Sequence, residues 1–170
     1  MNFTISVNTL TESYCERISA AFAAQGWNKL EAGYLNLLKE IQLGHRAMLV
    51  AEVEGEFAGY VTVVWNADYP PFREAAIPEI SDFKVLKRFQ RQGIGSALLD
   101  EAERLIGQRS KVAGIGVGLY ADYGTAHRLY IKRGYLPDGR GLFQDGRILT
   151  YGDQATVNDD LALYFTRNLD

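Results

Sequence analysis

The segment QRQGIGSALL, residues 90–99, constrains the fold of this chain more than any other. It places Gly93 and Gly95 a few residues after a β-rich run, 79–86, and at the start of apolar residues that recur at helical spacing. We therefore expect a helix over 95–107 that begins at the end of a strand. One face of this helix is apolar and predicts packing against a sheet, through Ile94, Ala97, Leu98, Ala102, Leu105 and Ile106. A strand, a glycine turn and a sheet-packed helix together predict an α/β fold.

The glycine turn is suited to an anion. Unpaired N–H groups and the helix dipole favour negative charge at a helix N-terminus. Gly93 and Gly95 leave the backbone bare there, and Arg91 adds positive charge. A turn that only lets strand and helix pack closely fits the glycines as well. A dinucleotide-binding turn needs a third glycine where this chain has Leu98, and the lysine and hydroxyl pair of a P-loop is missing.

The rest of the chain continues this pattern without a linker, repeat or low-complexity segment, so residues 1–170 are expected to form one domain. The sequence predicts a mixed central β-sheet flanked by helices. The other expected strands are 3–7, 48–53, 57–65, 112–120, a hairpin around 145–146, and 161–166. The other expected helices are 11–27, 30–43 and 125–133, and residues 66–78 are expected to form a loop.

Charge and apolar patterning exclude several partners. The formal net charge is −3, with 18 basic and 21 acidic residues spread along the chain, which disfavours nucleic acid. No apolar run reaches the roughly 18 residues that span a bilayer, and the first residues lack the pattern of a secretory leader. We expect a cytoplasmic protein that binds neither nucleic acid nor membrane. Cys15 is expected to be buried, and no cysteine, histidine and carboxylate cluster has ligand spacing, so no metal is expected.

The strand before the glycine turn is irregular. Phe83 and Val85 fall on one face, whereas Ile80 falls by parity on the other, so the alternation slips near Ser81-Asp82. A β-bulge explains the slip and frees main-chain groups for a ligand, although an edge effect or two solvated faces explain it as well. Farther along, the glycines of GIGVG, 114–118, indicate a strand with something lying against it.

Two motifs in this chain resemble the GCN5-related N-acetyltransferase (GNAT) family. The family's central motif, an apolar-x-Val strand end followed by Gln/Arg-x-x-Gly-x-Gly/Ala, is matched by FKV at 83–85 and QRQGIG at 90–95. A second motif, a helix ending in Leu-Tyr-x-x-x-Gly-Phe/Tyr, is matched by LYIKRGY at 129–135. The resemblance implies a GNAT-like fold whose central strand is bulged and splayed from its neighbour.

The resemblance also implies acetyl-CoA as the cosubstrate, with no metal. The N–H groups from Arg91 to Ser96 would hold its pyrophosphate, and the backbone of Phe83 to Val85 would pair with its pantetheine arm. Many relatives have an asparagine where this chain has Tyr123, and Asp122 or Tyr123 is expected to supply the polar contact instead. The implied coenzyme-binding residues are Phe83, Lys84, Val85, Gln90, Arg91, Gln92, Gly93, Ile94, Gly95, Ser96, Tyr123 and Tyr130.

In this family an amine attacks the thioester directly, without an acyl-enzyme. The N–H of Phe83 would stabilise the oxyanion, and Tyr130 would protonate the leaving sulfur, its other interpretation being a packed helix residue. Glu79 is a candidate general base or a solvated residue at a strand start. His127, one turn before Tyr130, is a candidate proton carrier, or a surface or capping histidine.

The expected function is therefore transfer of an acetyl group from acetyl-CoA to a primary amine of a small molecule or peptide. The alternative is a non-catalytic acyl-CoA-binding sensor or interaction module on the same fold. Tyr130 favours the enzyme, because a pure binder needs no acid directed at a thiol. The final strands fit a protected sheet edge and a homodimer equally. Acceptor selection is expected from the first two helices and the 66–78 loop, which offer Trp27, Tyr34, Tyr69, Phe72, Glu31 and Asp68.

Overall fold

The computed structural model describes residues 3–170, and its elements follow the order expected from the sequence with one added helix. The strands are β1 (Ile5–Thr9), β2 (Arg46–Val53), β3 (Glu56–Val64), β4 (Glu79–Val85), β5 (Val112–Gly118), β6 (Leu136–Gln144), β7 (Arg147–Ile148) and β8 (Ala162–Asn168). The helices are α1 (Glu12–Ala24), α2 (Glu31–Gln42), α3 (Pro70–Glu74), α4 (Ile94–Gly107) and α5 (Gly124–Lys132), with short 3-10 turns η1 (Lys87–Phe89) and η2 (Ala121–Tyr123).

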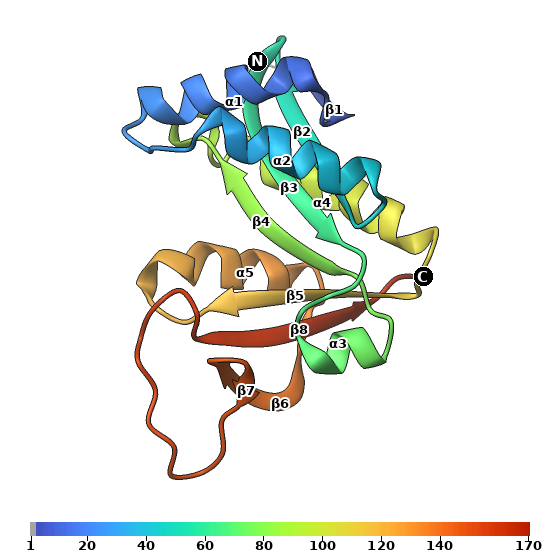
Figure 1. Ribbon diagram of the computed structural model, residues 1–170, viewed down its shortest axis with the longest axis vertical. Coiled ribbons are helices and arrows are strands. Elements are labelled where there is room, and N and C mark those ends of the chain that lie inside the picture. Colours follow the sequence, from blue (N-terminus) through green and yellow to red (C-terminus); the bar gives the residue numbers. More distant parts are fainter. Residues whose placement is uncertain (1–2) are drawn as a thin grey trace.

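The strands form one mixed sheet of eight, in the order β1-β2-β3-β4-β5-β8-β6-β7. Strands β1 to β4 are antiparallel neighbours, and so are β5, β8, β6 and β7. The two groups meet at the parallel pair β4 and β5, which is joined only at Glu79 with Gly114 and Ile80 with Ile115. Beyond these residues the two strands diverge (Figure 1). The splay expected from the sequence is therefore present.

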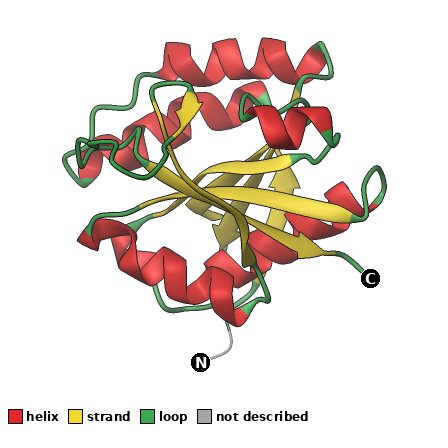
Figure 2. Ribbon diagram, turned by 90° about the horizontal axis from the view of Figure 1, so that it is seen from below, coloured by secondary structure: helices red, strands yellow, loops and turns green. Residues whose placement is uncertain are grey.

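Helices cover both faces of the sheet (Figure 2). Alternate residues of β2 divide between two cores, because successive strand side chains point to opposite faces. Leu49 and Ala51 join the core under α4, whereas Met48 and Val50 join the core under α1 and α2. The helix at the glycine turn therefore lies on the sheet face opposite α1 and α2. Cys15 is fully buried in the α1 and α2 core, as expected.

The expected β-bulge is confirmed in β4. Tyr60 of β3 pairs with Lys84, and Thr62 pairs with Ser81. Two residues of β4, Asp82 and Phe83, therefore stand opposite one residue of β3. The backbone of Asp82 has a φ of +45°, in the left-handed region that few residues other than glycine, asparagine and aspartate adopt. The slip in alternation therefore corresponds to a β-bulge in this strand.

Three expectations about element positions need correction. Residues 66–78 are not all loop, because Pro70 and Pro71 begin the short helix α3, a first-turn position that suits proline. The first strand is shifted to Ile5–Thr9, and the first helix ends at Ala24 rather than at residue 27. The last strand, β8, lies inside the sheet between β5 and β6, so the edges are β1 and β7. None of the helices within residues 3–170 is long and apolar enough to cross a membrane.

Candidate functional site

A cleft of about 420 Å³ opens where β4 and β5 diverge. Its walls come from β4, β5, α5 and the segment leading into β8. Five of the residues singled out from the sequence line it: Glu79, Phe83, Lys84, Tyr123 and Tyr130. Asp82, at the slip in alternation that the sequence showed, lines it too, whereas Phe143, Asp159, Asp160 and Tyr164 have no recognisable signal in the sequence. The C-terminal ones reach the cleft only because β8 is inserted beside β5.

The glycines of β5 shape the wall of this cleft. An added Cβ at Gly114 would lie 2.2 Å from Cε2 of Phe72, and one at Gly116 would lie 2.7 Å from Cε1 of Tyr164. At Gly118 it would lie 2.4 Å from Cε2 of Tyr123. The groups that lie against this strand, left open by the sequence, are therefore aromatic rings of the protein itself. They stand close to β5 because glycine has no side chain.

The main chain of β4 is free along the cleft. Residues 81–85 lie beyond the pairing with β5, so no strand covers this edge. Phe83 also stands outside the register with β3. The C=O of Val85 accepts a hydrogen bond from the Gln90 side-chain amide at 3.3 Å. The edge at residues 81–85 is thus open to a chain-like ligand that pairs as a strand does.

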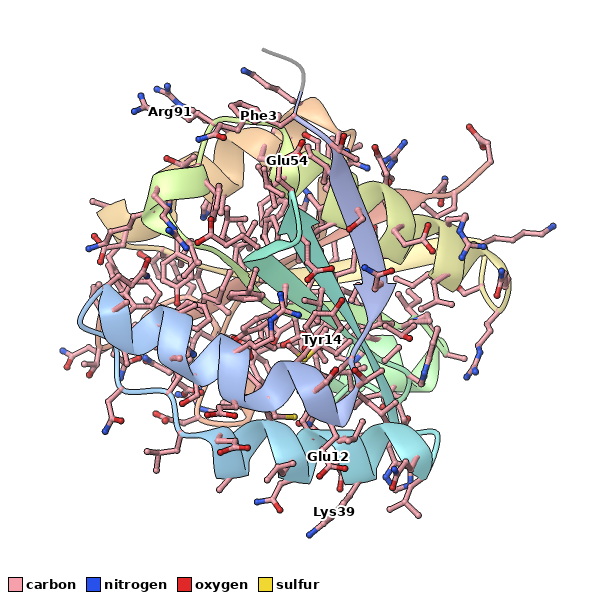
Figure 3. The ribbon with its side chains drawn as sticks, turned by 90° about the horizontal axis from the view of Figure 1, so that it is seen from above. Phe3, Glu12, Tyr14, Lys39, Glu54 and Arg91 are labelled. Atoms are coloured by element: carbon pink, nitrogen blue, oxygen red, sulfur yellow. The ribbon has the colours of Figure 1, made fainter. Side chains whose placement is uncertain are left out.

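The loop before α4 presents a row of unused donors. The N–H groups of residues 91–96 donate no hydrogen bond to any described residue, and the first bond of α4 runs from the Ala97 N–H to the Gly93 C=O, at 3.0 Å. Arg91 and Gly93 both have left-handed backbone, with φ of +60° and +89°. Figure 3 shows the Arg91 side chain projecting outward from this loop. Bare donors, the helix dipole and a guanidinium without an ion pair among the described residues all favour an anion at this loop.

The side chains of this loop hold its shape. The Gln92 amide donates to the Arg88 C=O at 2.9 Å, as that of Gln90 does to Val85. Ile94 is buried in the core, so its side chain fixes the start of α4 against the sheet. An added Cβ at Gly95 would lie 3.0 Å from Cζ of Phe83. The absence of a side chain at Gly95 therefore serves close packing on Phe83 as well as access to the backbone.

Glu79 begins β4 and lines the cleft. The pKa of its carboxyl is raised to about 7, chiefly by burial and also by the nearby carboxylate of Asp68, while Arg46 opposes the shift. A carboxylate with this pKa accepts and releases a proton near neutrality. Glu79 is partly exposed, at the wall of the cleft.

Tyr130 lies on α5, with 5% of its surface exposed. Its ring centroid is 6.4 Å from that of Phe83 across the cleft. Burial raises the pKa of Tyr130 above its ordinary value, and Tyr123 adds to the shift, so the phenol stays protonated at neutral pH.

Tyr123 lies close to the end of β5. Its ring packs on Gly118, and its hydroxyl donates to Asp159 at 3.1 Å. His127 lies 2.8 Å from the Gly118 C=O through its Nε2 and packs edge-on against Phe165. This geometry assigns His127 a contact that ties α5 to β5, rather than a position in the cleft.

The structure divides the expected residues into two adjoining groups. Glu79, Phe83 and Tyr130 share the cleft with Lys84 and Tyr123. The other expected coenzyme residues lie outside the cleft lining, on the strand end and the loop that lead from β4 to α4: Val85, Gln90, Arg91, Gln92, Gly93, Ile94, Gly95 and Ser96. Trp27 stacks on Phe22 of α1 and Tyr34 lies on α2, and neither lines the cleft. Tyr69 and Phe72 are buried in an aromatic cluster with Tyr164.

Solved structures share this fold. An N-acetyltransferase from Staphylococcus aureus aligns with a TM-score of 0.71 and 15% identity, over 98% of this chain and 99% of that chain. The protein yncA from Salmonella typhimurium, solved with its cofactor acetyl-CoA, aligns with a TM-score of 0.69 and 18% identity, over 98% and 94% of the two chains. Ard1 from Thermoplasma volcanium aligns with a TM-score of 0.67 and 21% identity, over 97% of each chain.

Comparison with the curated proteins finds no significant match. A family model described as the acetyltransferase (GNAT) domain matches residues 44–137, which is more than half of the chain. The matched range runs from the start of β2 into β6 and includes the bulged strand, the glycine loop and α5. On this match, together with the shared fold, the chain belongs to the GNAT acetyltransferase family.

Proposed function

We propose that this protein transfers an acetyl group from acetyl-CoA directly to a primary amine. The observation that carries the proposal is the cleft itself, which brings Glu79, Phe83 and Tyr130 together beside a loop of unused N–H donors. A site that only bound the coenzyme would need the loop but not a protonated tyrosine and a carboxylate with a pKa near 7.

The residues present fit acetyl-CoA. The N–H groups of residues 91–96 would bind its pyrophosphate, with Arg91 adding positive charge. The uncovered edge of β4 over residues 83–85 would bind the pantetheine arm. Lys84 and Tyr123 line the cleft between these two places and the reacting centre. When bound, the coenzyme supplies an activated acetyl group as a thioester.

The chain's own residues would then transfer the protons and stabilise the charge that develops on the thioester oxygen. Glu79 takes a proton from the acceptor ammonium, directly or through a water, which leaves a neutral amine to attack the carbonyl carbon. The Phe83 N–H donates to the oxygen that becomes negative. The Tyr130 hydroxyl donates its proton to the departing sulfur as the carbon–sulfur bond breaks. As the amide forms, its nitrogen loses a second proton to solvent, the tyrosinate regains one, and Glu79 releases the proton that it took, so the net products are the amide, the free thiol and one proton.

The proposal is tested by thiol release from acetyl-CoA across a panel of primary amines, with product mass confirming acetylation. Turnover that depends on the amine supports the enzyme. Tight coenzyme binding without amine-dependent thiol release would instead identify a non-catalytic sensor.

A further inference from the structure

A second cavity, of about 340 Å³, lies between α2 and the bulge of β4. Its walls include Lys29, Leu30, Tyr34, Leu37 and Tyr60, and Asp82 is the residue that it shares with the cleft. We propose that this cavity holds the acceptor, that Asp82 binds its ammonium group, and that the acceptor is a small primary amine with an uncharged, apolar body. The inference rests on the proposed function and names the substrate class for it.

Asp82 presents a fixed negative charge at the meeting point of the two cavities. Its carboxylate accepts a hydrogen bond from the hydroxyl of Tyr60 at 3.0 Å, and Tyr60 is completely buried. The side chain of Asp82 is exposed, and no described basic residue forms an ion pair with it. A carboxylate has about four acceptor positions, and the one bond from Tyr60 leaves the others free. An ammonium group offers three donors and the complementary charge.

Two tyrosines form the wall behind Asp82. Tyr34 has 6% of its surface exposed, and its ring packs edge-on against that of Tyr60, with centroids 5.8 Å apart. The hydroxyl of Tyr34 is itself buried, and that of Tyr60 is engaged with Asp82. At this wall the polar group that a ligand reaches is therefore the exposed carboxylate of Asp82.

The remaining walls decide the class of amine. Leu30 and Leu37 offer apolar surface, and Leu30 is 67% exposed at the cavity. Lys29 is the basic residue of the lining, so a second cationic group on the acceptor would meet like charge. The cavity therefore favours a monoamine with an apolar body over a diamine.

The position of Asp82 also suits the reaction. It directly precedes Phe83, so their Cα atoms are about 3.8 Å apart, and Glu79 lies on the same strand. An amine held at Asp82 lies beside the N–H that would bind the thioester oxygen. The bulge that opens this edge of β4 also turns Asp82 toward Tyr60.

Two substitutions test the assignment by steady-state thiol release, with an alkylamine compared with a diamine of the same chain length. Asp82→Asn keeps the size of the side chain, and asparagine tolerates left-handed backbone, so the fold is expected to persist. We expect KM for the alkylamine to rise about tenfold or more, with the dissociation constant of coenzyme A unchanged. Leu30→Glu adds a negative charge to the apolar wall and is expected to shift preference at least about threefold toward the diamine. Glu16→Gln, which removes an exposed carboxylate on α1, is the matched control and should change neither value.

Calorimetric titration of the alkylamine into protein saturated with coenzyme A gives a readout independent of turnover. Binding that weakens in Asp82→Asn supports the acceptor site even if no amine is acetylated, and that combination would overturn only the proposed function. Equal binding by Asp82→Asn and the parent overturns the assignment. A parent that prefers the diamine, or that acetylates only peptide N-termini, overturns the substrate class.

Discussion

Burial raises the pKa of two side chains that face one cleft, Glu79 and Tyr130. It disfavours the charged form of each, so the pKa of Glu79 rises to about 7 and that of Tyr130 rises above its ordinary value. At neutral pH the carboxyl is able to accept a proton while the phenol still holds one. A carboxyl and a phenol with these protonation states are suited to act as base and acid of one reaction.

Replacement of Tyr130 by phenylalanine distinguishes proton donation by the hydroxyl from packing of the ring. Tyr130→Phe keeps the ring that packs against Phe83 and Tyr135 but removes the proton offered to the leaving sulfur. We expect kcat to fall by roughly 100-fold, with coenzyme affinity little changed. Steady-state kinetics, coenzyme titration and a melting curve check this. Turnover within a few-fold of the parent would show that Tyr130 only packs in the fold, and a water would then be the candidate proton donor.

We predict that Glu79 sets the pH dependence of turnover. If it is the base, the parent's kcat/KM should fall about tenfold per pH unit as pH drops below about 7, because the protonated carboxyl cannot accept a proton. Glu79→Gln should be slower above pH 7 and should lack this dependence. A profile of unchanged shape in Glu79→Gln would exclude it as the base.

The same pKa predicts an effect on stability. The carboxyl of Glu79 has a folded pKa of about 7 against an ordinary value of 4.5, so the folded state favours the protonated form. The contribution of this carboxyl to the free energy of unfolding is fully present below pH 4.5 and is lost as pH rises through about 7. The glutamine of Glu79→Gln cannot ionise, so at about pH 8 the variant's free energy of unfolding should exceed the parent's by on the order of 2 kcal/mol. At about pH 5 this difference between variant and parent should be smaller. Urea unfolding of both proteins measures this, and an equal difference at both pH values would contradict it.

Sequence patterns predicted candidate residues that stand in local motifs and missed those that reach the cleft through contacts distant in the sequence. Gly93, Phe83 and Tyr130 stand at fixed spacings in the chain and could be named without a structure. Asp159 and Tyr164 reach the cleft only through the position of β8, and no spacing encodes that contact.

Secondary-structure elements show a similar division. Helix α4 was predicted well because its apolar stripe and glycine start are local signals, and it spans Ile94–Gly107. Helix α3 was missed because Pro70 and Pro71 were taken as loop residues, although proline also begins helices. Strand β4 was predicted with its bulge because the irregularity itself breaks the alternation of side chains.

A carboxylate at the start of α4 should compete with the phosphates for the same donors. Gly95→Asp places negative charge among the unused N–H groups, where the helix dipole stabilises it in place of the ligand. We expect coenzyme affinity to fall by about 100-fold in calorimetry. Gly95→Ala is the control for crowding, since it also places a Cβ 3.0 Å from Phe83, and should lose less than about tenfold. Equal losses in the two variants would assign the effect to packing and not to the phosphates.

The two halves of the sheet are connected by only a short strand pairing at the centre of the molecule. The two antiparallel groups of strands are held together by the short parallel pairing of β4 with β5, and α4 packs across both groups. The sequence predicted the strands and every helix except α3, but it left open where the last strands pair. That choice depends on long-range pairing, and β8 beside β5 completes one wall of the cleft.

A ligand that fills the space between β4 and β5 should therefore stabilise the whole fold. A coenzyme that binds only the folded state at about 100 times its dissociation constant contributes about 2.7 kcal/mol. For a domain of this size we expect Tm to rise by about 5–10 °C with coenzyme A.

No group of three or more metal-ligating side chains gathers within residues 3–170. The unused N–H donors of residues 91–96 need no cation to bind a phosphate, so a chelator should leave the increase in Tm unchanged. Thermal unfolding with and without chelator measures this, and Gly95→Asp should abolish the shift at the same coenzyme concentration. A shift that disappears in chelator and returns with zinc or magnesium would show that the loop alone does not hold the phosphates.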